Sequence, residues 1–132
     1  MSAVENRQMM QDVYAELGVG NSKPFVECLA EDVRWTIRGT TKWSRTFEGK
    51  EAVLTKLIGP LFEQFADRYT ATADRFIAEG DFVVAEVQGR VTTKTGKLYN
   101  NRYCYIFRIV DGKVRELIEY LDTQLVVEVF GN

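Results

Sequence analysis

The second half of the sequence has the pattern of consecutive β-strands, and this pattern constrains the fold more than any other feature. Apolar and polar residues alternate there, as expected for strands with two different faces. The predicted strands are 69–79, 82–93, 98–110 and 113–123. They are separated by Gly80-Asp81, Thr95-Gly96 and Asp111-Gly112, which are typical turn pairs. Short turns between neighbouring strands predict an antiparallel sheet.

The first half of the sequence is mainly helical. Apolar residues recur at helical spacing over 4–17, and a short helix is expected after Asn21-Ser22. A third, longer helix is predicted over 50–66, with a kink at Gly59-Pro60. One strand, which includes Val33, Trp35 and Ile37, interrupts this region. Helices followed by strands predict an α+β fold.

The length of 132 residues fits one domain, 1–132, because domains cluster at about 100–150 residues. The formal net charge is −2, and no run of like-charged residues is long enough to indicate nucleic-acid or membrane binding. The N-terminus lacks the pattern of a signal peptide, and Cys28 and Cys104 have no metal-site spacing. We therefore expect a cytoplasmic chain in a reducing compartment.

The chain contains no histidine, which excludes Ser-His-Asp and Cys-His catalytic systems and imidazole-dependent metal sites. Acid–base chemistry near neutral pH would then depend on carboxylates, Tyr, Lys or Cys with shifted pKa values. The Gly-Lys pairs lack the preceding glycine of a phosphate-binding loop, and Gly18-Val19-Gly20 follows a helix instead of a strand. We expect no cofactor and no metal.

Turn lengths predict which residues share a face of the sheet. A two-residue loop at Asp111-Gly112 would pair Arg108 with Arg115, so we prefer a three-residue loop that pairs Tyr103 with Glu119. A two-residue loop at Thr95-Gly96 places Glu86 opposite Tyr105. One predicted face then comprises Val84, Glu86, Gln88, Arg90, Asn101, Tyr103, Tyr105, Phe107, Leu117, Glu119 and Leu121. The other comprises Val83, Ala85, Val87, Cys104, Ile106, Ile118 and Tyr120.

The pattern by itself favours the second, more apolar face as the core and the first as a solvated face. The aromatic and leucine residues on the first face argue against that interpretation, because they would be exposed to water. If both faces are covered, the polar-lined face forms a cavity under the helices. The apolar face would then be a contact between subunits.

Several short segments resemble the NTF2-like superfamily, in particular its SnoaL-like and ketosteroid-isomerase-like branch. They are Ala30-Glu31-Asp32-Val33-Arg34-Trp35, Phe47-Glu48-Gly49-Lys50-Glu51-Ala52-Val53, Asp111-Gly112-Lys113-Val114 and Glu119-Tyr120-Leu121-Asp122. The resemblance covers nearly the whole chain. It implies a cystatin-like cone, in which a curved, mostly antiparallel sheet wraps a long helix and two further N-terminal helices are present. It also implies a pocket on the polar-lined face and a homodimer through the other face.

The resemblance does not carry an activity with it, because a fold does not determine chemistry. The general base of ketosteroid isomerases corresponds to Ile37 here, and their hydrogen-bonding aspartic acid corresponds to Tyr105. In the distantly similar limonene-type epoxide hydrolases, the paired carboxylates correspond to Gln88 and Glu119, and the linking arginine to Glu86. Only Glu119 retains the chemistry of its counterpart.

The predicted catalytic residues are Glu119 as acid or base, Glu86 as a second carboxylate and Tyr103 as a hydrogen-bond donor. A salt bridge to Arg90 or Arg102 is the structural alternative for Glu119. The predicted ligand contacts are Tyr14, Trp35, Ile37, Arg38, Trp43, Phe62, Phe65, Gln88, Arg90, Asn101, Tyr105, Leu117 and Leu121.

Two functions fit these predictions. The first is a cofactor-independent isomerase, cyclase or hydrolase that acts on a small apolar molecule of polyketide, steroid or terpenoid type. The second is a non-catalytic module that binds a ligand or a partner chain.

Overall fold

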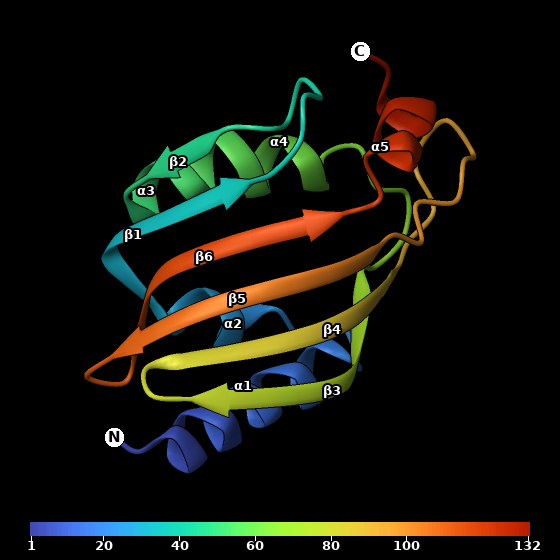
Figure 1. The fold of residues 1–132 in the computed structure, drawn as a ribbon. Helices are drawn as coiled ribbons and strands as arrows, with labels where there is room; N and C mark the ends of the chain where they lie inside the picture. The colour runs from blue at the N-terminus through green and yellow to red at the C-terminus, as the bar shows by residue number, and fades with distance from the viewer.

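A curved six-stranded sheet and the helices that cover its concave face make up the structure, a computed structural model that describes residues 1–132 (Figure 1). The strands are β1 (Leu29–Ile37), β2 (Thr46–Glu48), β3 (Thr70–Glu79), β4 (Phe82–Arg90), β5 (Arg102–Val110) and β6 (Lys113–Leu121). Their order in the sheet is β2-β1-β6-β5-β4-β3, and only β1 and β6 are parallel. The predicted α+β class and mostly antiparallel sheet are confirmed.

The N-terminal helices are α1 (Ala3–Leu17) and α2 (Lys23–Glu27). Ser2 and Glu5 form a capping box that satisfies the first free N–H groups of α1. The predicted apolar stripe of α1, which includes Met10 and Leu17, is buried against β3 and β4. Figure 1 shows α1 lying against the edge of the sheet that is formed by β3 and β4.

The long helix consists of α3 (Lys50–Ala52), the π-helical turn η1 (Val53–Ile58) and α4 (Gly59–Phe62). A kink is predicted at Gly59-Pro60; the structure has a π-helical turn directly before these residues, in which the Gly59 N–H donates to the Leu54 carbonyl. The helix ends before residue 66, the predicted end. The reason is that the Ala66 N–H donates to the Thr92 carbonyl in an extended segment.

The predicted register between β4 and β5 is wrong by one residue, because the connecting loop is longer than expected. The Thr93 N–H donates to the Lys97 carbonyl, so three residues form the loop, and Gly96 adopts the left-handed region (φ +83°). Val87 therefore pairs with Tyr103, whereas Gln88 pairs with Arg102. A one-residue change moves every side chain of a strand to the opposite face.

This correction reverses the predicted orientation of β4. Val83, Ala85 and Val87 are buried on the concave face, so they do not belong to the outer surface predicted for dimer formation. Val84, Glu86, Gln88 and Arg90 lie on the outer face instead. The other predicted outer residues lie on the outer face: Cys104, Ile106 and Ile118 are half-buried there, and Tyr120 is exposed.

The predicted three-residue loop between β5 and β6 is also wrong, but without effect on the faces. Asp111 and Gly112 form a two-residue turn with positive φ at both positions, as in a type I′ turn. A bulge opposite Ile109 then shifts the register, so that Arg108 pairs with Glu116 and avoids Arg115. The net shift is two residues, which leaves Tyr103, Tyr105 and Glu119 on the concave face as predicted.

The C-terminal helix α5 (Thr123–Phe130) closes one end of the space between sheet and helices. Asp122 caps it, because its carboxylate accepts a hydrogen bond from the Leu125 N–H at 3.1 Å. Val126 and Phe130 of α5 pack toward the interior, against a small cluster with Phe65 and Tyr99. None of the helices has the length and apolar character that a membrane span requires.

Candidate functional site

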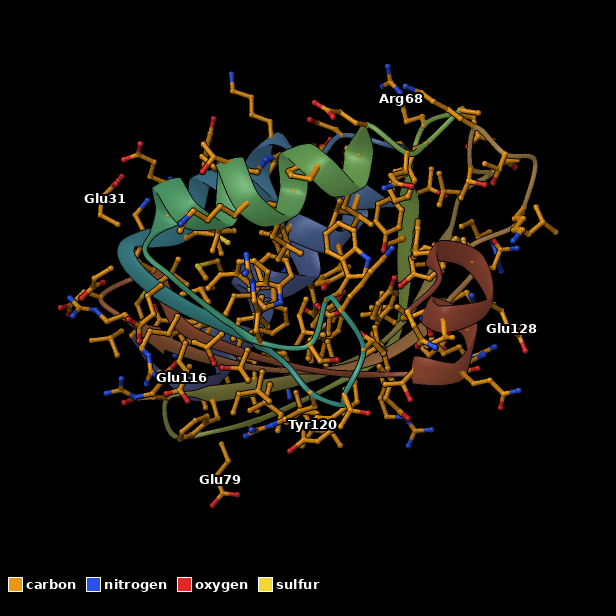
Figure 2. All side chains as sticks on the ribbon, turned by 90° about the horizontal axis from the view of Figure 1, so that it is seen from above. Glu31, Arg68, Glu79, Glu116, Tyr120 and Glu128 are labelled. Atoms are coloured by element: carbon orange, nitrogen blue, oxygen red, sulfur yellow. The ribbon has the colours of Figure 1, made fainter.

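A cavity lies between the concave face of the sheet and the helices, and 21 of its 24 lining residues are hydrophobic. Figure 2, seen from above, shows side chains crowded between the long helix and the sheet, whereas Glu79 and Tyr120 point away from the helices. The cavity encloses about 100 Å³. For comparison, an engineered cavity of roughly 150 Å³ holds one benzene molecule. A ligand of benzene size or larger therefore requires lining side chains, such as the partly exposed Phe62, to move.

Glu119 is the carboxylate of this cavity. It lies on β6, is only 5% exposed, and its Oε1 accepts a hydrogen bond from the indole Nε1 of Trp35 at 2.9 Å. Burial raises the pKa of Glu119 to about 7, and the hydrogen bond from Trp35 acts in the opposite direction. The alternative of a salt bridge to Arg90 or Arg102 is not realised, because no basic side chain pairs with Glu119.

Tyrosines surround this carboxylate. The rings of Tyr103 and Tyr105 stack with their centroids 5.1 Å apart, and Tyr14 approaches from α1. Burial raises the pKa of all three hydroxyls well above 10, so these groups remain protonated donors at neutral pH. Burial likewise raises the pKa of Tyr99 to about 12, against the effect of hydrogen bonds with Asn101 and Tyr103.

Ten of the predicted site residues line the cavity. They come from the first helix, the first strand and its following loop, the long helix and the last two strands. They are Tyr14, Trp35, Ile37, Trp43, Phe62, Phe65, Tyr103, Tyr105, Glu119 and Leu121. The correct face assignment of β5 and β6 and the apolar stripes of the helices place most of these residues at the cavity.

Three predicted site residues of β4 lie on the outer face, because the actual register of β4 against β5 differs by one residue from the predicted one. Glu86 forms an ion pair with Arg75, which excludes it as a second carboxylate in the cavity. Gln88 donates hydrogen bonds to the carbonyls of Gly89, Asn100 and Asn101. Arg90 is exposed at the end of the strand.

Three further residues that were predicted to contact the ligand do not line the cavity. Arg38 is exposed and lies 5.8 Å from the centroid of the Tyr120 ring. Asn101 is fully buried but its amide is bonded to the backbone of Asp122, with distances of 3.1 and 3.0 Å. Leu117 is fully buried in the main core and does not line the cavity.

Fourteen of the 24 residues that line the cavity were not predicted from the sequence. The missed residues are mostly apolar and come from the helices, from β3 and β4, and from loops. They are Leu17, Ser22, Phe25, Val26, Thr41, Leu57, Ile58, Leu61, Tyr69, Ala71, Val87, Tyr99, Val126 and Phe130. Most of these residues are apolar, and an apolar pattern in the sequence does not separate core residues from cavity residues.

The arrangement supplies one buried carboxylate, several phenolic donors and apolar walls. No group of three or more His, Cys, Asp or Glu side chains gathers anywhere in the structure in a way that could hold a metal ion. The site is therefore equipped to bind an uncharged, mainly apolar molecule and to exchange a proton with it.

A family model described as the SnoaL-like domain matches residues 10–117. Solved structures show the same fold. An NTF2-like protein from Burkholderia xenovorans LB400 is 25% identical, with a TM-score of 0.73 and 98% of each chain covered. A putative SnoaL-like polyketide cyclase from Jannaschia sp. CCS1 is 18% identical, with a TM-score of 0.78 and coverage of 98% of this chain and 93% of that one.

A third similar structure is TerC co-crystallized with polyporic acid. It is 18% identical, with a TM-score of 0.78 and coverage of 96% of this chain and 98% of that one. No curated protein matches the chain significantly.

Proposed function

The chain belongs to the SnoaL-like domain family and has its NTF2-like fold, and from this premise we propose that it is a cofactor-independent enzyme that moves protons on a small, largely apolar molecule. The observation that carries this proposal is Glu119, a buried carboxylate that lines the cavity and has no basic partner. A group with a pKa of about 7 can both accept and return a proton near neutral pH.

The single carboxylate narrows the reaction type. Glu86 is outside the cavity, so no second carboxylate is available to activate a water while Glu119 acts as an acid. We infer an isomerisation or cyclisation in which Glu119 takes a proton from a carbon next to a carbonyl group. The electron pair of the broken C–H bond forms the C=C bond of an enolate, while the carbonyl π pair moves onto oxygen. In an isomerisation the carbonyl re-forms and Glu119 returns the proton to another carbon. In a cyclisation the enolate carbon instead attacks a second carbonyl carbon of the same molecule, whose π pair moves onto its oxygen, and Glu119 gives the proton to that oxygen.

The tyrosines support this reaction by their position and protonation. Tyr103 and Tyr105 line the cavity on the strand next to Glu119, with raised pKa values that keep their protons in place. A hydroxyl donor directed at the carbonyl oxygen would stabilise the negative charge that develops there. Tyr103 is the proposed donor, since it is buried in the cavity wall and its hydroxyl is hydrogen-bonded to those of Tyr69 and Tyr99.

The proposed substrate is a neutral carbonyl compound with an aromatic or alicyclic body. The cavity wall is mainly apolar and aromatic, and no Lys or Arg lines it to bind an anion. The structural similarity to a putative polyketide cyclase supports the same class of molecule.

Turnover of a panel of enolisable ketones, epoxides and polyketide-like aromatics would test this proposal. We expect Glu119→Gln to lower kcat/KM at least about 100-fold, as is typical when a general base is lost. Glu86→Gln is the matched control, because it changes a carboxylate on the outer face, and it should retain the wild-type rate. Equal rates for wild type and Glu119→Gln on every substrate found would refute the role of Glu119.

The second candidate function is a non-catalytic ligand-binding module. It is favoured by the small cavity and by Ile37, which stands where the similar ketosteroid isomerases carry their general base. A ligand from the panel that binds tightly without any turnover would support this function over the first.

We also propose that the chain forms a homodimer through the outer face of the sheet. Ile106, Ile118 and Tyr120 lie there, and the exposed side chains of Ile77 and Phe82 extend the same apolar surface. Sedimentation at micromolar concentration should give a species of twice the 15.1 kDa chain mass. A species of 15.1 kDa as the sole component would refute the dimer.

A further inference from the structure

Trp35 and Glu119 meet because β1 and β6 are parallel neighbours. The register places Trp35 beside Leu117 and Ile37 beside Glu119, so the indole reaches across to the carboxylate. The distance from Nε1 to Oε1 is 2.9 Å, and both side chains are less than a tenth exposed. An indole N–H only donates, so the carboxylate is the acceptor of this bond.

The indole is held in place by its packing. Trp35 is part of the main core, and its ring contacts Phe25 of α2 with the centroids 5.8 Å apart. Since a packed aromatic side chain has few alternative rotamers, the direction of its N–H is fixed. The bond therefore constrains the carboxylate more than a bond from a flexible surface side chain would.

Trp35 is the only hydrogen-bond partner of the Glu119 side chain. Oε1 is engaged by this bond, so Oε2 remains for a ligand. A hydrogen bond to a carboxylate is stronger than one to a neutral acid, and it favours the ionised form. The indole thus opposes the effect of burial, which favours the protonated form of Glu119.

No other group near Glu119 lowers the pKa of its carboxyl. The ionisable side chains that face it are tyrosines from α1, from the segment before β3, from the loop between β4 and β5, and from β5. They are Tyr14, Tyr69, Tyr99, Tyr103 and Tyr105. Burial raises the pKa of each, so all are neutral when Glu119 titrates.

We propose that Trp35 is a positioning residue for Glu119, whose indole N–H holds Oε1 and presents Oε2 as the oxygen that exchanges a proton with the substrate. The role of Oε2 rests on the proposed function, whereas the control of the carboxylate by Trp35 does not require any turnover. Trp43 lines the same cavity, but its indole N–H is buried without a partner, so it provides a natural comparison.

NMR tests this proposal in the wild-type protein, which contains two tryptophans. We expect the Trp35 indole ¹H–¹⁵N signal to shift with pH at the midpoint of the Glu119 carboxyl ¹³C signal, because ionisation strengthens the bond. The Trp43 signal should not follow that midpoint. A Trp35 signal that is insensitive to this titration would overturn the proposal, and this measurement does not depend on the folding of any variant.

The variants Trp35→Phe and Trp43→Phe form a matched pair, since each removes an indole from the same cavity. We expect Trp35→Phe to raise the Glu119 midpoint by about one pH unit, whereas Trp43→Phe leaves it unchanged. If a substrate is found, the pH profile of kcat/KM should move upward in the same way. Equal midpoints in wild type and Trp35→Phe would reject the positioning role. If the Glu119 midpoint rises in Trp35→Phe and not in Trp43→Phe, but no substrate is turned over, only the proposed enzymatic function is rejected.

Discussion

The buried carboxylate Glu119 makes the stability of this protein depend on pH in an unusual direction. Its pKa is about 7 in the folded state, against an ordinary value of 4.5 that applies to the unfolded chain. Between these values the folded state binds more protons than the unfolded state, so the free energy of unfolding falls as pH rises. The contribution is fully present below pH 4.5 and is lost as pH rises through about 7.

The magnitude follows from the two pKa values. With a pKa of about 7 in the folded state and 4.5 in the unfolded state, Glu119 lowers the free energy of unfolding by about 2–3 kcal/mol as pH rises from 5 to 8. Glu119→Gln has no ionisable group at this position, yet its amide oxygen can still accept the Trp35 hydrogen bond. The variant should therefore lack this loss and gain stability relative to wild type at high pH.

Urea denaturation at pH 5, 6, 7 and 8 measures this difference directly. The other titrating groups contribute equally to both proteins, so the difference in free energy of unfolding between wild type and Glu119→Gln isolates position 119. Glu86→Gln is the control, because Glu86 is half-exposed in a surface ion pair, and it should follow wild type. A constant difference between wild type and Glu119→Gln from pH 5 to pH 8 would refute the assignment of a raised pKa.

Three further variants test the packing around the cavity. Gly89→Ala should lower the free energy of unfolding by about 1–3 kcal/mol in urea, because the new Cβ would lie 2.7 Å from the Tyr69 hydroxyl and 3.1 Å from the Tyr103 ring. Asp122→Ala should cost about 1 kcal/mol through loss of the α5 cap, and Asp122→Asn should restore most of it. Phe130→Ala removes a ring from the cavity wall, so an apolar fluorescent dye should bind more strongly than to wild type; unchanged dye binding would contradict the role of α5 as a wall.

Local sequence patterns predicted the elements well, because helices and strands have different apolar periods. The stripe of α1, the strand around Trp35 and the four C-terminal strands are all present. The turn lengths were harder to predict. At Gly96 and at Asp111-Gly112 either two or three loop residues satisfy the local chemistry, and the choice depends on how the strands pack.

These choices affect the site because side chains alternate along a strand. A register error of two residues between β5 and β6 left Glu119 on the correct face, whereas an error of one residue moved Glu86 from the cavity to the outer surface. Of the two carboxylates predicted for the cavity, only Glu119 lines it. The other is a surface residue paired with Arg75.

The fold class, the order of the elements and the restriction of any acid–base chemistry to groups other than histidine can all be read from the order of residues along the chain. The surroundings of Glu119 cannot. Residues 35 and 119 are far apart in the chain, and no local pattern indicates that β1 and β6 pair in parallel and bring the indole to the carboxylate. Burial and hydrogen bonding set the protonation of a carboxyl group, and both depend on residues that only folding brings together.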